Sequence, residues 1–146
     1  TVRSDRATLE AQEFAPFKAL NDIAMGMTCH LVFTAIDPDN PATTSSKMID
    51  VIRQDIGFGG LIMTDDIGME ALSGTVPERG AAALKAGCDL VLHCNGDRAE
   101  QVAMAAALSP MTQAATTRAN HALSQRKPPV PIDISACTAE LDALIA

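Results

Sequence analysis

Hydrophobic and polar residues along the chain follow two different spacings. Apolar residues about 3.6 positions apart predict a helix over residues 7–20, kinked at Pro16, and a near-continuous apolar run predicts a strand over residues 25–36 that is buried on both faces. Further along, the same patterns predict helices over 47–56, 77–86 and 98–123 and strands over 61–64 and 89–94. Helices and strands therefore alternate, an order typical of parallel βα units.

The sheet that these strands would form is small. An all-parallel sheet of three strands must be covered on both faces and protected at its edges. We therefore expect either a small doubly wound sheet or the later part of a (β/α)8 barrel, which needs about 250 residues when complete. Around it, Ser109-Pro110 divides the last long helix, and residues 67–73 form a loop or a short helix. An extended Pro-rich tail begins at Arg126 and ends in a helix over residues 138–146.

Composition and charge exclude several classes of protein. The chain has 146 residues, a net charge of −7 and 3% aromatic residues, so it lacks the positive charge and the stacking platforms of a nucleic-acid-binding protein. Its longest apolar stretches are about eight to ten residues, well short of the roughly 20 of a membrane-spanning helix. The four cysteines lack CxxC spacing, which favours free thiols in a reducing compartment over a disulfide or zinc site. Without a Gly-rich phosphate loop or a metal-spaced histidine pair, we expect no cofactor and no metal.

One carboxylate stands out as a candidate for chemistry. The apolar strand over residues 61–64 runs directly into Asp65-Asp66, and the alternation of side chains puts Asp65 on the same face as Leu61 and Met63. Catalytic groups in parallel βα folds gather at the carboxyl ends of strands, so this position suits a catalytic Asp65. The structural alternative is that both aspartates cap the segment that follows, and for Asp66 we favour that interpretation.

Three stretches carry a family resemblance. MTCHLVFTAIDPDNPAT, IRQDIGFGGLIMTDDIGMEAL and ERGAAALKAGCDLVLHCN together resemble the glycoside hydrolase family 3 β-N-acetylglucosaminidases of bacterial peptidoglycan recycling. The resemblance implies an α/β fold, the C-terminal portion of a (β/α)8 TIM barrel with about three parallel strands and flanking helices. It divides the chain into the C-terminal half of a glycoside hydrolase barrel over residues 1–125 and a Pro-rich extended tail with a short terminal helix over residues 126–146.

The same resemblance assigns the chemistry. The aspartate of the family's (S/T)DD element after the seventh strand is the nucleophile of a retaining glycosidase, and this element falls on Asp65. The family's acid/base is an Asp-His pair on a mobile loop, in a stretch that this sequence does not contain and that would precede the RATLE segment. We therefore expect the chain to hold half an active site and to have little or no hydrolase activity alone, because loss of acid assistance costs about 10²–10⁴-fold in rate.

Other polar and sulfur-containing residues are secondary candidates. His30 is either a hydrogen-bonded residue of the core or rim or a substrate contact, and Met69 is expected to pack beside the sugar. His93 is expected to be structural and His121 exposed. Asp37 and Asp39 follow a predicted strand end but lie in a Pro-rich turn, which favours a turn-forming role. The end of the third strand, Cys94-Asn95, is a further candidate for the lining of a substrate pocket.

The function implied by the resemblance is removal of terminal N-acetylglucosamine from muropeptide sugars that carry 1,6-anhydro-N-acetylmuramic acid, by a cytoplasmic enzyme without a cofactor. Three barrel strands leave unpaired edges, so we expect pairing with a complementary N-terminal half, edge-to-edge self-association, or a trimmed portion of a longer protein. The alternative is a receiver-like phospho-accepting signalling domain, which needs an acidic pair on its first strand and a strand-end lysine that the sequence lacks. A purely structural fragment is a third possibility.

Overall fold

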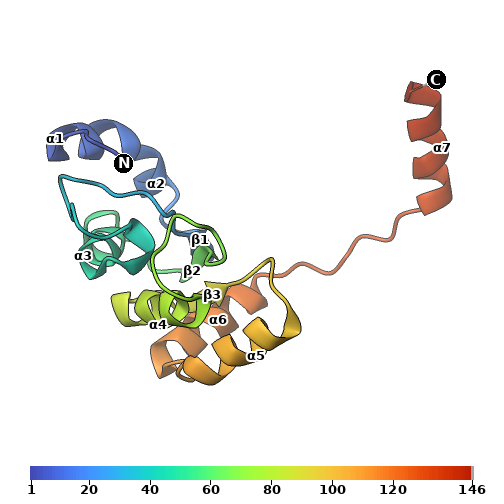
Figure 1. Cartoon of the computed structure of the whole chain (residues 1–146). Coiled ribbons are helices and arrows are strands. Elements are labelled where there is room, and N and C mark those ends of the chain that lie inside the picture. The colour runs from blue at the N-terminus through green and yellow to red at the C-terminus, as the bar shows by residue number, and fades with distance from the viewer. Residues whose placement is uncertain (146) are drawn as a thin grey trace.

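The computed structural model describes residues 1–145, which fold around a three-stranded parallel sheet. Its strands are β1 (Met25–Met27), β2 (Leu61–Asp66) and β3 (Leu90–Leu92), and they lie in the sheet in chain order, with β2 in the middle. Figure 1 shows helices packed around this sheet and a separate helix at the C-terminus. The prediction of an α/β fold with about three parallel strands is confirmed.

The helices that flank the sheet begin and end where the sequence supplies caps. The helix α3 (Ser46–Asp50) begins where the Ser45 hydroxyl accepts a hydrogen bond from the Met48 amide, and it continues as the π-helical turn η3 (Val51–Asp55). The helix α4 (Val76–Ala86) begins at a capping box and ends at Gly87, whose positive φ of 115° suits only glycine. These caps fix where α3 begins and where α4 begins and ends.

Two helices follow β3 in the body. They are α5 (Arg98–Ala107) and α6 (Gln113–Ser124), separated at Ser109-Pro110 as predicted. The linker after α6 is extended, and the last helix, α7 (Ile134–Ile145), begins four residues before the predicted start because the Asp133 carboxylate accepts a hydrogen bond of 3.0 Å from the Ala136 amide. Within residues 1–145, no helix is long and apolar enough to cross a bilayer.

In the first third of the chain one prediction holds in outline and one is wrong. The helix expected over residues 7–20 forms in three pieces, α1 (Arg6–Thr8), the π-helical turn η1 (Leu9–Glu13) and α2 (Ala15–Ala19), with a break at Phe14 and Pro16 in the first turn of α2. The strand expected over residues 25–36 is limited to β1. After it the chain leaves the sheet and turns into the 3₁₀ helix η2 (Ala42–Thr44).

The shortness of β1 has a physical cause. It pairs with β2 on one side only, and its Met25 and Met27 side chains are 44% and 54% exposed, so the expectation of burial on both faces is also wrong. Beyond it, Thr28 and His30 hydrogen-bond the Thr43 hydroxyl, which draws the chain toward η2 instead of along the sheet. An apolar run is therefore not sufficient to extend a strand that has a single neighbour.

The core lies mainly between the sheet and the helices that precede it. Its larger cluster includes Leu9, Phe14, Ile49 and Ile62, which come from η1, the start of α2, α3 and β2. A smaller cluster of Ile67, Leu72 and Val76 packs the turn after β2 against the start of α4. Together they fix both ends of β2, the strand that carries the candidate nucleophile.

A buried ion cluster holds the amino ends of β2 and β3, at the end of the sheet away from Asp65. Asp89, immediately before β3, accepts hydrogen bonds from Arg53 at 2.7 Å, from Nε of Arg118 at 2.9 Å and from the Ile62 amide at 2.9 Å. Burial alone would raise the pKa of Asp89, but the hydrogen bond from Arg118, the Ile62 amide and the charges of both arginines outweigh it, so its pKa lies below the ordinary value of 3.8. One carboxylate thus joins η3 and α6 to β2.

Candidate active site

Asp65 lies at the carboxyl end of β2, near the end of the central strand. Its side chain is partly exposed, and its Oδ1 accepts a hydrogen bond of 2.8 Å from the amide of Asp66. Within residues 1–145 no other group hydrogen-bonds this carboxylate, so Oδ2 is unoccupied by protein. This arrangement suits a nucleophilic carboxylate, because one oxygen is held by an N–H donor while the other is free to attack.

Asp66 has a different role. Its Oδ1 accepts hydrogen bonds from the amides of Gly68 at 3.0 Å and Cys94 at 3.1 Å. The Gly68 amide, against the effect of burial and together with the Cys94 amide and the nearby His93, holds the pKa of Asp66 below its usual range. Asp66 therefore closes the turn after β2 and joins the carboxyl ends of β2 and β3. It caps a turn, because no helix follows until α4.

His30 reaches the same point from the segment after β1. Its Nε2 donates a hydrogen bond of 2.9 Å to the backbone carbonyl of Asp66, and its Nδ1 lies 2.8 Å from the Thr43 hydroxyl. Both ring nitrogens therefore have partners inside the protein. The geometry is that of a hydrogen-bonded rim residue, which was one of the two interpretations open from the sequence.

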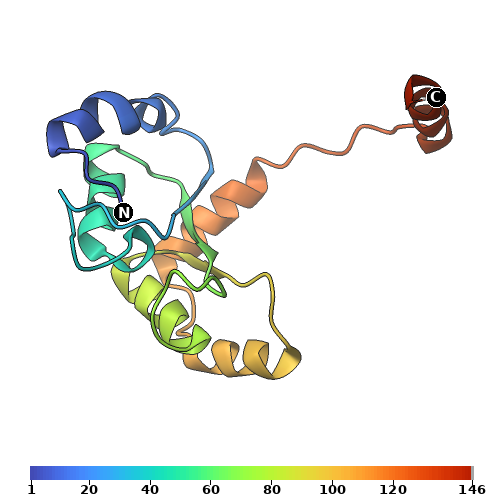
Figure 2. The same cartoon turned by 45° about the horizontal axis from the view of Figure 1, so that its top comes forward.

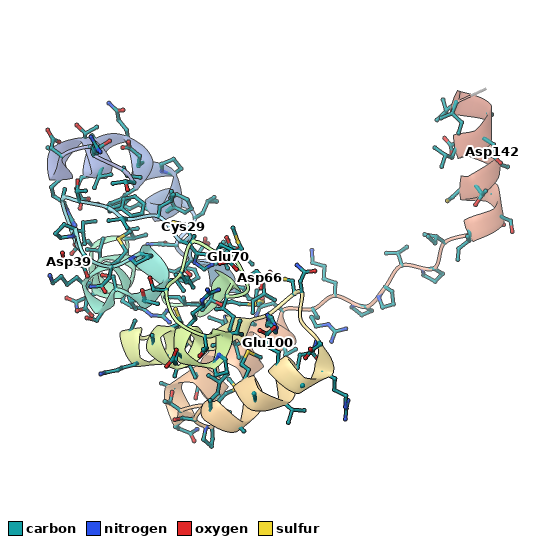
Figure 3. All side chains as sticks on the ribbon, in the orientation of Figure 1. Cys29, Asp39, Asp66, Glu70, Glu100 and Asp142 are labelled. Carbon is teal, nitrogen blue, oxygen red and sulfur yellow. The ribbon has the colours of Figure 1, made fainter. Side chains whose placement is uncertain are left out.

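His93 forms a contact that sequence reasoning did not find. Its side chain is 2% exposed and lies between two carboxylates, with Nε2 at 3.1 Å from Glu100 and Nδ1 at 3.6 Å from Oδ1 of Asp66. Nδ1 is buried without a hydrogen-bond partner. A Cβ atom at Gly96 would overlap both the imidazole and the Glu100 carboxylate, so this contact requires glycine there. Figure 3 shows Asp66 and Glu100 at the same end of the sheet.

The remaining candidates lie around this edge or away from it. Met69 follows β2 on the turn, is 45% exposed, and donates its amide to the Asp66 carbonyl at 3.1 Å. Asp37 is buried and accepts a hydrogen bond of 2.7 Å from Ser45, which, against burial and with Asn40, holds the pKa of Asp37 below its usual range. It is a turn former, as favoured from the sequence, and Figure 3 shows Asp39 away from Asp66. Cys94 donates its amide to Asp66 from an exposed position.

Among the residues that the structure describes, no group of three His, Cys, Asp or Glu side chains is arranged to hold a metal ion. A cavity of about 460 Å³ lies elsewhere, between α4 and the connection from α5 to α6. The strand ends offer an open carboxylate, Asp65, with one oxygen bound to the Asp66 amide, and His30 holds the carbonyl of the next residue.

Known proteins are similar to this chain in sequence and in fold. Residues 1–124 match the family profile of the glycosyl hydrolase family 3 N-terminal domain. A beta-hexosaminidase of Alkalilimnicola ehrlichii is 44% identical over 95 residues, which is 62% of this chain and 27% of that protein. The family match favours the glycosidase interpretation over the receiver-like alternative.

Solved structures agree with the sequence comparison. A family 3 beta-N-acetylglucosaminidase from Paenibacillus superposes with a TM-score of 0.73 at 27% identity, covering 91% of this chain and 29% of that one. NagZ from Neisseria gonorrhoeae, in complex with N-trifluoroacetyl-D-glucosamine, gives 0.71 at 31% identity, covering 82% and 36%. The chain thus spans about a third or less of these relatives. With its profile match over residues 1–124, the chain belongs to the glycosyl hydrolase family 3 N-terminal domain family.

Proposed function

We propose that this chain supplies the nucleophile half of a retaining β-N-acetylglucosaminidase, with Asp65 as the nucleophile. The observation that carries the proposal is the Asp65 carboxylate itself: it ends the central parallel strand, has one oxygen fixed by the Asp66 amide and has the other open. The relatives named beta-hexosaminidase and the family profile supply the reaction class.

In the proposed reaction, Oδ2 of Asp65 attacks the anomeric carbon of the sugar. A covalent ester forms between Asp65 and that carbon while the glycosidic C–O bond breaks, and the leaving oxygen takes a proton from a general acid. Water then attacks the same carbon, gives a proton to the conjugate base and releases Asp65 as a carboxylate. The hydrogen bond that Oδ1 accepts from the Asp66 amide holds the carboxylate in place, with Oδ2 free to attack.

We expect the general acid to come from a part of the enzyme other than residues 1–145. His30 uses both ring nitrogens within the protein, His93 is buried behind Asp66, and His121 is exposed on α6. Lack of acid assistance costs about 10²–10⁴-fold in rate. We therefore expect these residues alone to be nearly inactive and to work with a complementary barrel half.

The proposed substrate is a peptidoglycan fragment with terminal N-acetylglucosamine, such as an anhydro-muropeptide in the cytoplasm. NagZ from Neisseria gonorrhoeae binds N-trifluoroacetyl-D-glucosamine, an N-acylated amino sugar, which supports this choice. Met69 is exposed on the turn after Asp65, and His30 holds that turn's carbonyl, so both would border the sugar.

Complementation tests the proposal. The full chain is mixed with the N-terminal barrel half of the Alkalilimnicola ehrlichii relative, and hydrolysis of an aryl N-acetyl-β-glucosaminide is measured. We expect the mixture to exceed either part alone by at least about 100-fold, and Asp65→Asn to abolish the gain. Full-rate turnover by the chain alone would contradict the half-site, and an active Asp65→Asn mixture would contradict the nucleophile.

A further inference from the structure

The terminal helix α7 carries an apolar surface that none of residues 1–145 covers. At 100° per residue, five side chains fall within an arc of about 100°. We call them the α7 stripe: Ile134, Cys137, Leu141, Leu144 and Ile145. The four aliphatic members are 56–77% exposed. Glu140 and Asp142 border the stripe on its two sides, so α7 is amphipathic with acidic margins.

Such a helix needs a partner to be stable. Isolated helices of about 12 residues are marginal in water, and most helical stability in proteins comes from packing of an apolar face. The α7 helix has 12 residues, and Figures 1 and 2 both show it apart from the body at the end of an extended linker. We therefore expect the α7 stripe to pack against an apolar surface of a partner.

The body offers one groove of suitable character. The cavity of about 460 Å³ between α4 and the α5–α6 connection is lined mainly by apolar and small side chains, and we call this surface the α4 groove: it includes Ala81, Leu84, Leu108, Pro110, Met111 and Ala115. Met111 is 43% exposed. Lys85, also in the lining, is exposed and forms no ion pair within residues 1–145. A lysine at the groove complements the acidic margins of the stripe.

The linker decides which copy of the groove α7 can reach. Residues 126–133 contain Pro128, Pro129 and Pro131, and a Pro-rich segment of this length is a semi-rigid spacer of roughly 25 Å. The groove includes Ala115 near the start of α6, which is roughly 18 Å long, and the linker leaves from the other end of α6. Folding back would require reversal at Gln125 and would carry α7 past its own groove. An arm directed away from the body reaches a neighbouring molecule without that reversal.

We propose that α7 is an exchanged arm: its stripe docks into the α4 groove of a second copy of this chain, with Glu140 facing Lys85. Two copies exchanging arms about a twofold axis form a closed dimer in which each contact occurs twice. This dimer uses neither the sheet edge at β1 nor the Asp65 edge, so it is independent of the proposed catalytic function.

The first test is the mass of the full chain in solution. We expect light scattering after gel filtration to give twice the chain mass of 15.3 kDa. Leu141→Asp puts a charge in the stripe and should halve the measured mass, whereas Ala139→Asp puts the same charge on the opposite face and should leave it unchanged. Lys85→Glu should also give monomers, and adding Glu140→Lys should restore the dimer. A monomeric full chain, or a dimer that persists with Leu141→Asp, overturns the proposal.

The second test identifies the contact between copies. Both samples carry Cys29→Ser and Cys94→Ser. One also carries Ala81→Cys and Cys137→Ser, and the other keeps Cys137. In the mixture, mild oxidation should join position 81 to Cys137 in a covalent dimer, a bond that can form only between copies. If this product is absent while a single chain carrying both Ala81→Cys and Cys137 closes an internal disulfide, α7 docks on its own body and the exchanged arm is wrong.

Discussion

The imidazole of His30 donates a hydrogen bond of 2.9 Å from Nε2 to the backbone carbonyl of Asp66. This bond joins the segment after β1 to the end of β2, one residue beyond the proposed nucleophile. The other ring nitrogen lies 2.8 Å from the Thr43 hydroxyl, which itself contacts Thr28 and the Cys29 carbonyl. A single side chain therefore connects η2, the end of β1 and the Asp65 edge.

His30→Ala should destabilise the fold. It removes two partly buried hydrogen bonds, each with a net contribution of about 0.5–1.5 kcal/mol, so we expect the free energy of unfolding to fall by about 1–3 kcal/mol in urea titrations. His121→Ala, on the exposed side of α6, is the matched control and should change it by less than about 0.5 kcal/mol. Equal effects of the two substitutions would show that the His30 contacts are not formed.

Asp89→Asn should be costly at neutral pH and nearly harmless in acid. The substitution leaves Arg53 and Arg118 without their counter-charge, which we expect to lower the free energy of unfolding by about 2–3 kcal/mol at pH 7. The pKa of Asp89 is lower in the folded than in the unfolded chain, so its contribution is complete above the ordinary value of 3.8 and is lost as the pH falls through the folded value. Urea titrations from pH 7 to pH 3 should therefore show the two proteins converging below about pH 4. A difference that is constant with pH would contradict the ion cluster.

Gly96→Ala should separate His93 from Glu100. A methyl group at this position overlaps the buried imidazole and the carboxylate, so one of them has to move, at an expected cost of about 1–3 kcal/mol in the free energy of unfolding. Gly59→Ala is the control, because a Cβ atom there meets nothing within 4 Å. NMR of the His93 ring should report a changed environment in the first variant and none in the second. An unchanged His93 spectrum in Gly96→Ala would mean that the ring does not contact Glu100.

The four thiols should differ in reactivity. Burial, with the neighbouring Asp89, raises the pKa of the Cys88 thiol to about 12, so almost none of it is thiolate at pH 8. Cys94 is exposed. With iodoacetamide and peptide mapping, we expect Cys94 to react first and Cys88 to react only after unfolding. Early alkylation of Cys88 in the native chain would contradict its burial.

Local pattern predicted part of this structure well. The apolar run that ends in Asp65 and Asp66 forms β2, and Ser109-Pro110 separates α5 from α6, because each depends on residues next to one another in the chain. The position of Asp65 at a strand end follows from the same run. These features needed only periodicity, proline geometry and the length of the run.

The features that the sequence did not predict depend on distant residues. The length of β1 depends on whether a second strand pairs with it and on the hydrogen bonds to Thr43. The periodicity of the residues in β1 contains no information on either. The contact of His93 with Glu100 and Asp66 brings together residues of α5, of β2 and of the segment after β3, and glycine at position 96 was the only local sign of it. Asp89 lies in one of the three stretches that carry the family resemblance, but its two arginines come from η3 and α6.

Covalent trapping tests the role of Asp65 most directly. The full chain, combined with a complementary barrel half, is incubated with a 5-fluoro N-acetylglucosaminyl fluoride, whose reactive leaving group reduces the need for an acid, and is digested for mass spectrometry. We predict one added fluorosugar on the peptide that contains Asp65, its loss in Asp65→Asn, and its retention in Asp66→Asn, whose amide oxygen still accepts the Gly68 and Cys94 N–H groups. A sugar attached to any other side chain, or labelling that persists in Asp65→Asn, would contradict the assignment of Asp65 as the nucleophile.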